Sequence, residues 1–118
     1  MALAEGYPIN SVYHANRIAG NAIMNDTYSL HLHAFSFGEV AGIVLPYEMF
    51  DTSGIEVKTQ SPFTKTFIVG YSWPANGGYV PSALGFENGG YEPNNCIFVP
   101  GTGEELVEQW LTLLNSMK

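Results

Sequence analysis

Val40-Ala41-Gly42-Ile43-Val44-Leu45 is a short, apolar run rich in β-branched residues, which is typical of a strand buried inside a sheet. The preceding residues, 27–37, alternate between two sets of side chains, as in a strand with one buried face. Gly38 and Glu39 separate the two segments, so we expect a β-hairpin that turns at Gly38. A second apolar run at residues 66–71 predicts another buried strand.

A helix is expected between the two buried strands. Residues from Glu48 to about Thr59 suit a helix, with a weak middle at Ser53-Gly54 and a stop at Ser61-Pro62-Phe63. Residues 73–95 are rich in Gly, Pro and aromatic residues and are interpreted as a long loop, either functional or structural.

The last helix has both a start signal and an apolar face. Thr102 suits an N-cap, and Glu105 stands three residues later, as in a capping box. The apolar residues that follow recur at three- and four-residue spacing and should face the sheet. They are Leu106, Trp110, Leu113, Leu114 and Met117.

The order of these elements predicts an α/β fold. We expect a small sheet of three to four strands with a β-hairpin, packed by two to three helices, the C-terminal one amphipathic. Residues 1–118 are then either a single domain or the C-terminal lobe of a larger one.

Composition excludes several classes of partner. The net charge is −7, and the cations are Arg17, Lys58, Lys65 and Lys118. Binding to nucleic acid or to an anionic membrane surface needs clustered Lys and Arg, so neither is expected. Cys96 is the sole cysteine, which rules out an internal disulfide and a Cys-based zinc site.

The sequence says little about the compartment. No apolar run reaches the length of a transmembrane segment, and the first residues lack the features of a signal peptide. We expect a soluble protein, either secreted or cytoplasmic. Charged residues make up only 13% of the chain, so its exterior is covered either by neutral polar side chains or by another domain.

Glu48 and Tyr79 are the main candidates for chemistry. Glu48 follows a buried strand, where functional groups gather in α/β proteins, but spacing alone favours a carboxylate at the start of a helix. Tyr79 lies in the segment after the next strand, where it is either a ligand or oxyanion stabiliser, or an aromatic cap on the core. His31 and His33 have a metal-ligand spacing on a strand, although their face also carries Phe residues; His14 is isolated.

Four segments resemble neutral/alkaline ceramidases and their bacterial relatives. Residues 38–48, from Gly-Glu-Val-Ala to Leu-Pro-Tyr-Glu, are similar to the family's G-D-x-A…L-P-G-E segment. Residues 76–82, Asn-Gly-Gly-Tyr-Val-Pro-Ser, are similar to N-x-Y-x-x-Y-(I/V)-(T/P)-(T/S). Gly-Gly-Tyr-Glu at 89–92 and Pro-Gly-Thr-Gly-Glu at 100–104 follow in the family's order. Tyr47 stands where the family has Gly, and Asp-Thr-Ser-Gly at 51–54 replaces T-T-M-x-G-R-R.

The resemblance implies a zinc-dependent amidohydrolase that cleaves an N-acyl sphingoid base. It implies that Glu48 and Tyr79 are zinc ligands, and that two His ligands come from an N-terminal part of the enzyme outside this chain. Zinc would then belong to the longer parent protein, while this chain alone would bind none and be inactive. The alternative is a non-catalytic binding or interaction domain that forms a homo-oligomer, with exposed aromatic residues at its interface.

Overall fold

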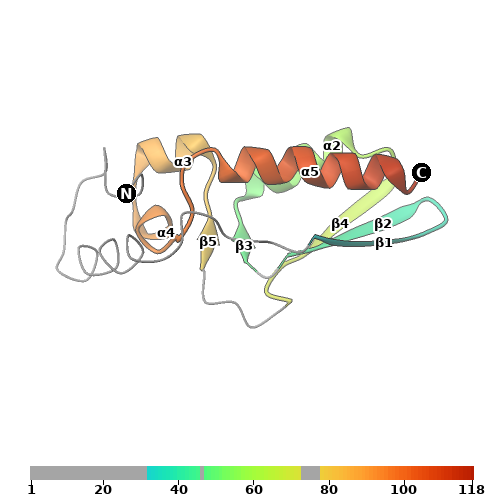
Figure 1. The fold of residues 1–118 in the computed structure, drawn as a ribbon, viewed down its shortest axis with the longest axis horizontal. Helices are drawn as coiled ribbons and strands as arrows, with labels where there is room; N and C mark the ends of the chain where they lie inside the picture. The colour runs from blue at the N-terminus through green and yellow to red at the C-terminus, as the bar shows by residue number, and fades with distance from the viewer. Residues whose placement is uncertain (1–31, 46, 73–77) are drawn as a thin grey trace.

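The computed structural model describes residues 32–45, 47–72 and 78–118 (Figure 1). His14 and His31 lie outside these residues, as does the first part of the predicted strand at 27–37. The described residues form a mixed α/β fold in which helices lie along one side of a three-stranded sheet.

The sheet has the strand order β1-β2-β4. β1 (His33–Phe37) and β2 (Val40–Val44) are antiparallel, and Phe37 pairs with Val40 across the turn at Gly38 and Glu39. Gly38 has a φ of 58°, which glycine adopts without strain. β4 (Lys65–Val69) lies parallel to β2 on its other side. The predicted hairpin and three strands are therefore confirmed, although β4 is only partly buried.

The helix between β2 and β4 begins later than the sequence suggested. α2 spans Asp51–Gln60, whereas Glu48 and Met49 form a short strand, β3 (Glu48–Met49). Ser53 and Gly54, the predicted weak middle, lie on the buried side of a continuous helix. A Cβ on Gly54 would approach Cδ1 of Ile68 to 2.9 Å. The small residue thus lets α2 pack closely on β4, which offsets its intrinsic cost in a helix of about 1 kcal/mol.

The segment interpreted as a long loop holds regular structure, so that prediction was wrong. It contains β5 (Tyr79–Val80), α3 (Ala83–Asn88) and α4 (Tyr91–Asn94), while residues 73–77 lie outside the described part. The Ser82 side chain caps α3 by accepting a hydrogen bond from the backbone N–H of Gly85 at 3.1 Å. Short helices of this kind have too few turns to show a 3.6-residue period, which explains why the pattern did not reveal them.

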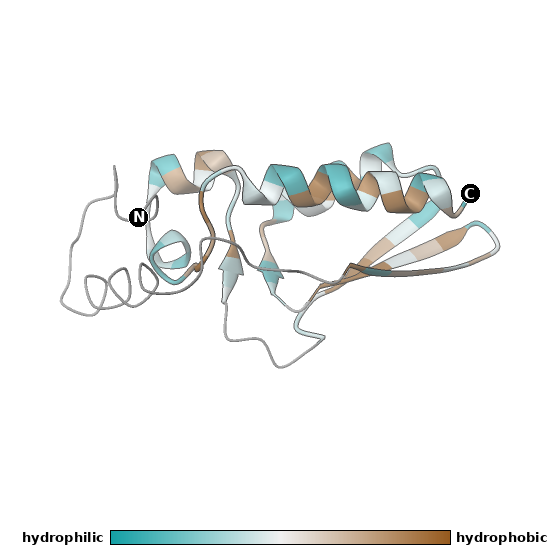
Figure 2. Cartoon of the chain, viewed as in Figure 1, coloured by the Kyte–Doolittle hydropathy of each residue, from teal (hydrophilic) through white to brown (hydrophobic). Residues whose placement is uncertain are grey.

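α5 (Thr102–Ser116) is the predicted amphipathic C-terminal helix, and its alternating hydropathy is visible in Figure 2. The predicted capping box is wrong, because Thr102 is the first helical residue and Gly101 is the N-cap without a side-chain hydrogen bond. Glu104 instead accepts a hydrogen bond from the backbone N–H of Ala83 at 2.8 Å, joining the starts of α5 and α3.

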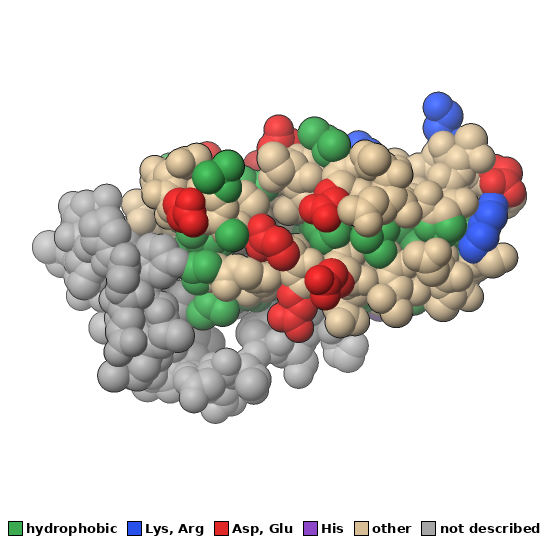
Figure 3. Space-filling view, turned by 90° about the horizontal axis from the view of Figure 1, so that it is seen from above, with side chains coloured by type: hydrophobic (Ala, Val, Ile, Leu, Met, Phe, Trp, Pro, Cys, Tyr) green, Lys and Arg blue, Asp and Glu red, His purple; other side chains and the backbone are tan. Residues whose placement is uncertain are grey.

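The core lies between the sheet and the helical layer. Burying one large apolar side chain contributes roughly 1.5–3 kcal/mol, so this layer supplies most of the stability. The buried residues are Ala41, Ile43, Leu45, Tyr47, Val57, Phe63, Val80, Phe86, Cys96, Phe98, Leu106, Val107, Trp110 and Leu114. Acidic side chains are spread over the outer side of the helical layer (Figure 3). None of the described helices is both long and apolar enough to cross a membrane.

The other face of the sheet carries exposed aromatic rings. Phe35, Phe37 and Phe67 are 39%, 64% and 39% exposed. The Phe35 ring stacks on Phe37 at 6.2 Å between centroids and meets Phe67 edge-on at 5.5 Å. Gly42 lies beneath Phe35 and Phe67, where a Cβ would approach their rings to 2.6 and 3.0 Å. We call this the open face of the sheet.

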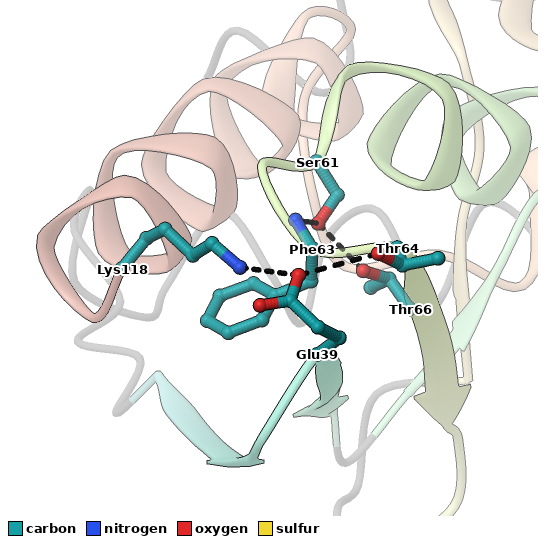
Figure 4. A network of polar contacts seen from close by, with 6 residues as sticks. All are labelled: Glu39, Ser61, Phe63, Thr64, Thr66 and Lys118. Atoms are coloured by element: carbon teal, nitrogen blue, oxygen red, sulfur yellow. Dashed lines mark hydrogen bonds and ion pairs between the residues drawn. The ribbon is translucent and has the colours of Figure 1, made fainter.

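The C-terminus is tied to the hairpin turn. Lys118 forms an ion pair with Glu39 at 2.5 Å, and its ammonium lies 4.9 Å from the centroid of the Phe63 ring. Glu39 also accepts a hydrogen bond from the Thr64 hydroxyl at 3.2 Å (Figure 4).

Candidate functional site

Glu48 and Tyr79 occupy paired positions in a second, two-stranded sheet. β3 and β5 run parallel, and their register places Glu48 beside Tyr79 and Met49 beside Val80. The backbone N–H of Glu48 donates to the carbonyl of Gly78 at 3.0 Å. Paired residues of adjacent strands project from the same face, so the carboxylate and the phenol are neighbours.

The buried residues before Glu48 fix its position. Leu45 continues the β2–β4 pairing, because its backbone N–H donates to the carbonyl of Val69 at 2.9 Å. Tyr47 is 2% exposed and packs edge-on against Phe98 with 4.9 Å between ring centroids. With these two side chains in the core, Glu48 follows directly and is left half-buried at the carboxyl end of β2. Tyr47 therefore serves as a core residue at the position where the ceramidase segment has Gly.

Gly78 permits the approach of β5 to β3. Its φ is +67°, and a Cβ at this position would collide with the backbone carbonyl oxygen of Asn95. Gly78 also forms an antiparallel bridge with Cys96, so it is held on both sides. Only glycine satisfies both the left-handed backbone and the close contact.

Tyr71 is a third member of the cluster, and the sequence did not identify it. It follows the end of β4, as Glu48 follows the end of β2, and Glu48 is the leading cause of the raised pKa of its phenol. Its φ of 53° lies in the left-handed region, the one such non-glycine residue in the described chain. Its position just beyond a parallel strand was the available signal, because groups at these strand ends meet at one edge of a sheet.

The shared carboxylate raises the pKa of both phenols. Hydrogen bonding to Glu48, supported by desolvation and by the negative charges of Glu48 and Tyr79, raises the pKa of Tyr71 to about 12. Desolvation raises the pKa of Tyr79, with the charge of Glu48 as the next cause. Both phenols thus keep their protons at neutral pH.

Tyr91 and Glu92 lie beside Tyr79 on the other side. The Tyr91 ring meets the Tyr79 ring edge-on, with centroids 5.9 Å apart. The charge of Glu92 contributes to the raised pKa of Tyr79. These residues belong to the Gly-Gly-Tyr-Glu segment noted in the sequence, and the fold brings that segment against the candidate pair.

The candidate histidines do not join this cluster within the described residues. His33 is exposed on β1, where it pairs with Val44 on the open face of the sheet. His14 and His31 lie outside the described residues. The part of the chain that the structure describes contains no group of three or more His, Cys, Asp and Glu that could hold a metal ion.

The Glu48 carboxylate and the Tyr79 phenol place two oxygen donors side by side. Zinc accepts carboxylate oxygen and is held by three protein ligands in hydrolytic sites and four in structural ones. The interpretation of Glu48 as a helix-start carboxylate is wrong, since it lies in β3 ahead of α2.

No protein-family model matches this chain, and neither does any curated protein or solved structure.

Proposed function

We propose that this chain contributes part of the zinc site of a ceramidase-like amide hydrolase. Glu48 and Tyr79 are two of the ligands, and two His ligands come from a part of the enzyme outside this chain. The substrate is an N-acyl amide of the sphingoid-base class. The observation that carries the proposal is the register of β3 and β5, which makes the two residues neighbours although they are far apart in sequence.

The surroundings of the pair support a cation-binding role. Glu48 raises the pKa of both Tyr71 and Tyr79, and the negative charge of Glu92 also raises the pKa of Tyr79. No lysine or arginine of the described chain is among the groups that shift these two pKa values. A site with this charge favours either protons or a cation.

Each residue has a distinct task in the proposed site. When bound, zinc supplies Lewis-acid polarisation of the amide carbonyl and activation of water. The Glu48 carboxylate offsets the charge of the cation. The Tyr79 phenol loses its proton when the cation is bound beside it and keeps its proton when the cation is absent. The Tyr91 ring restricts the Tyr79 ring by edge-on contact. Two ligands are fewer than the three that zinc requires, so this chain alone is expected to be inactive.

Ultraviolet difference spectroscopy of the 118-residue chain tests the ligand pair. Zinc is added at pH 8 together with imidazole, which stands in for the missing His side chains. We expect a zinc-dependent tyrosinate band, because a cation beside Tyr79 reverses the effect of Glu48 on its pKa. The band should disappear in Tyr79→Phe and Glu48→Gln and persist in Tyr91→Phe, which keeps the ring but removes a neighbouring hydroxyl.

A wild-type chain without a tyrosinate band, or a band that survives in Tyr79→Phe, would contradict the ligand assignment. Tight stoichiometric zinc binding without imidazole would show that the ligand count is wrong. In a longer protein that contains this chain, Glu48→Gln should lose bound zinc and hydrolysis of an N-acyl sphingoid base together.

The open face of the sheet favours a second candidate function, that of an interaction domain. Phe35, Phe37 and Phe67 form one aromatic surface, and no described element covers it. Sheets commonly pack face to face through such surfaces. In this alternative, two copies of the chain pair through their open faces, and the Glu48–Tyr79 pair has no catalytic role.

A further inference from the structure

We propose that Glu39 and Lys118 form a latch, released by salt, that controls local opening of the sheet at the hairpin turn. The latch goes beyond the proposed function, because β2 begins at this turn and only its other end leads to Glu48 (Figure 1). Three observations support it: the contacts that meet at Glu39, the cover that Lys118 gives to Phe63, and the exposure of the ion pair.

Glu39 joins segments that are 25 and 79 residues away in the sequence. One oxygen of its carboxylate, Oε2, accepts from both the Lys118 ammonium and the Thr64 hydroxyl. Its backbone carbonyl accepts a hydrogen bond at 3.2 Å from the N–H of Lys65, the first residue of β4. A single residue of the hairpin turn thus holds the start of β4 and the C-terminal end of α5 (Figure 4).

Lys118 covers one end of the core. Its ammonium lies 4.9 Å from the centroid of the Phe63 ring, which is 6% exposed and belongs to the same core as Leu114. The loop that carries Phe63 has its own contacts, because the Phe63 N–H and the Thr66 hydroxyl both donate to the Ser61 hydroxyl, at 3.2 and 2.6 Å. Release of Lys118 therefore uncovers the ring without removing the contacts of its loop.

The ion pair is weak enough to open while the rest of the fold persists. The side chains of Lys118 and Glu39 are 35% and 66% exposed, and exposed pairs contribute little to global stability. Salt weakens them further, since the Debye length falls from about 10 Å at 0.1 M to about 3 Å at 1 M. Local opening occurs where contacts are few and exposed. Because Phe37 pairs with Val40 beside this turn, the opening also loosens one ring of the open face.

Native-state amide hydrogen exchange of the 118-residue chain, followed by NMR, tests the latch. Two amides report on opposite ends of the β2–β4 pairing: the N–H of Lys65, bonded to the Glu39 carbonyl, and that of Leu45, bonded to the Val69 carbonyl. We expect Lys65 to exchange faster than Leu45 and with little dependence on denaturant, because a local opening exposes little surface. If Lys65 shared the rate and the denaturant dependence of Leu45, this end would open only with the whole fold, and the latch would be refuted.

Lys118→Met removes the charge and keeps an unbranched apolar side chain near Phe63. It should speed exchange at Lys65 about 2- to 5-fold at low salt, the range expected from loss of an exposed ion pair. The difference from the wild type should vanish at about 1 M NaCl. Lys58→Met is the matched control, since it removes an exposed charge from the last turn of α2 and should leave Lys65 exchange unchanged. An unaltered rate at Lys65 in Lys118→Met, or a difference that persists in high salt, would overturn the inference.

Discussion

The Glu48 carboxylate is the group on which the candidate site depends, because it raises the pKa of two tyrosines from different segments. Tyr71 follows the end of β4 with a left-handed backbone, and Tyr79 is placed beside Glu48 by the register of two short strands. In both cases the protonated phenol is the favoured form.

The ionisation of these tyrosines should depend on Glu48. The pKa of Tyr71 is raised to about 12, and that of Tyr79 is also raised. Because the folded protein favours the neutral phenols, their contribution to stability is complete below the ordinary pKa of about 10. The contribution of Tyr71 is lost as the pH rises through about 12, and that of Tyr79 as the pH rises through its own raised pKa. Glu48→Gln should move both pKa values down toward about 10, which absorbance of tyrosinate across an alkaline titration will measure.

Glu108→Gln is a suitable control for that titration, since Glu108 is exposed on α5. It should leave the tyrosine titration unchanged. If Glu48→Gln and Glu108→Gln gave the same curve, the contact between Glu48 and the phenols would be refuted.

The two faces of the main sheet differ in what they contact. Ala41 and Ile43 point into the core, while the alternate residue Gly42 lies beneath the rings of Phe35 and Phe67. This alternation follows from the two-residue period of a strand. A small residue in the central strand makes room for aromatic side chains from both neighbours, so the rings of Phe35 and Phe67 meet on the open face.

Pairing through the open face predicts a dimer that depends on its aromatic residues. Light scattering during size-exclusion chromatography should give twice the monomer mass for the wild type. Phe37→Ser should shift the protein toward monomer, because Phe37 is the most exposed ring of this face at 64%. Leu84→Ser is the matched control, since Leu84 is 61% exposed but lies on α3. A wild type that stays monomeric at high concentration would refute this interface.

At one end of the molecule, Lys118 contacts Glu39 in the hairpin turn. Glu39 and Lys118 come from opposite parts of the sequence, and Lys118 also lies over the Phe63 ring (Figure 4). The side chains of Lys118 and Glu39 are 35% and 66% exposed, so salt should screen the pair.

The Glu39–Lys118 pair should make stability depend slightly on acid and on salt. Hydrogen bonding to Lys118, and then the charge of Lys118, lower the pKa of Glu39 below 4.5. The deprotonated carboxylate is favoured in the folded state, so its contribution is present above pH 4.5 and is lost as the pH falls through the lowered pKa. Glu39→Gln should lower the melting temperature slightly at neutral pH and low salt, with the difference shrinking in high salt. An equal loss at pH 3 would contradict the ion pair.

The sequence by itself determined the hairpin, the strand after α2, and the amphipathic α5. These features depend on local periodicity and on turn residues such as Gly38, which are visible in a short stretch of chain. It also singled out Glu48 and Tyr79, through their place after apolar strands and through the ceramidase-like segments around them.

The tertiary structure alone decided how these residues meet. β3 and β5 contain two residues each, too few to show a period, and their hydrogen bonds join segments that are distant in sequence. Tertiary pairing therefore overrode the local preference that had placed Glu48 at the start of a helix. Tyr71 was missed because its position beside Glu48 depends on the parallel pairing of β2 and β4, which no local sequence pattern shows.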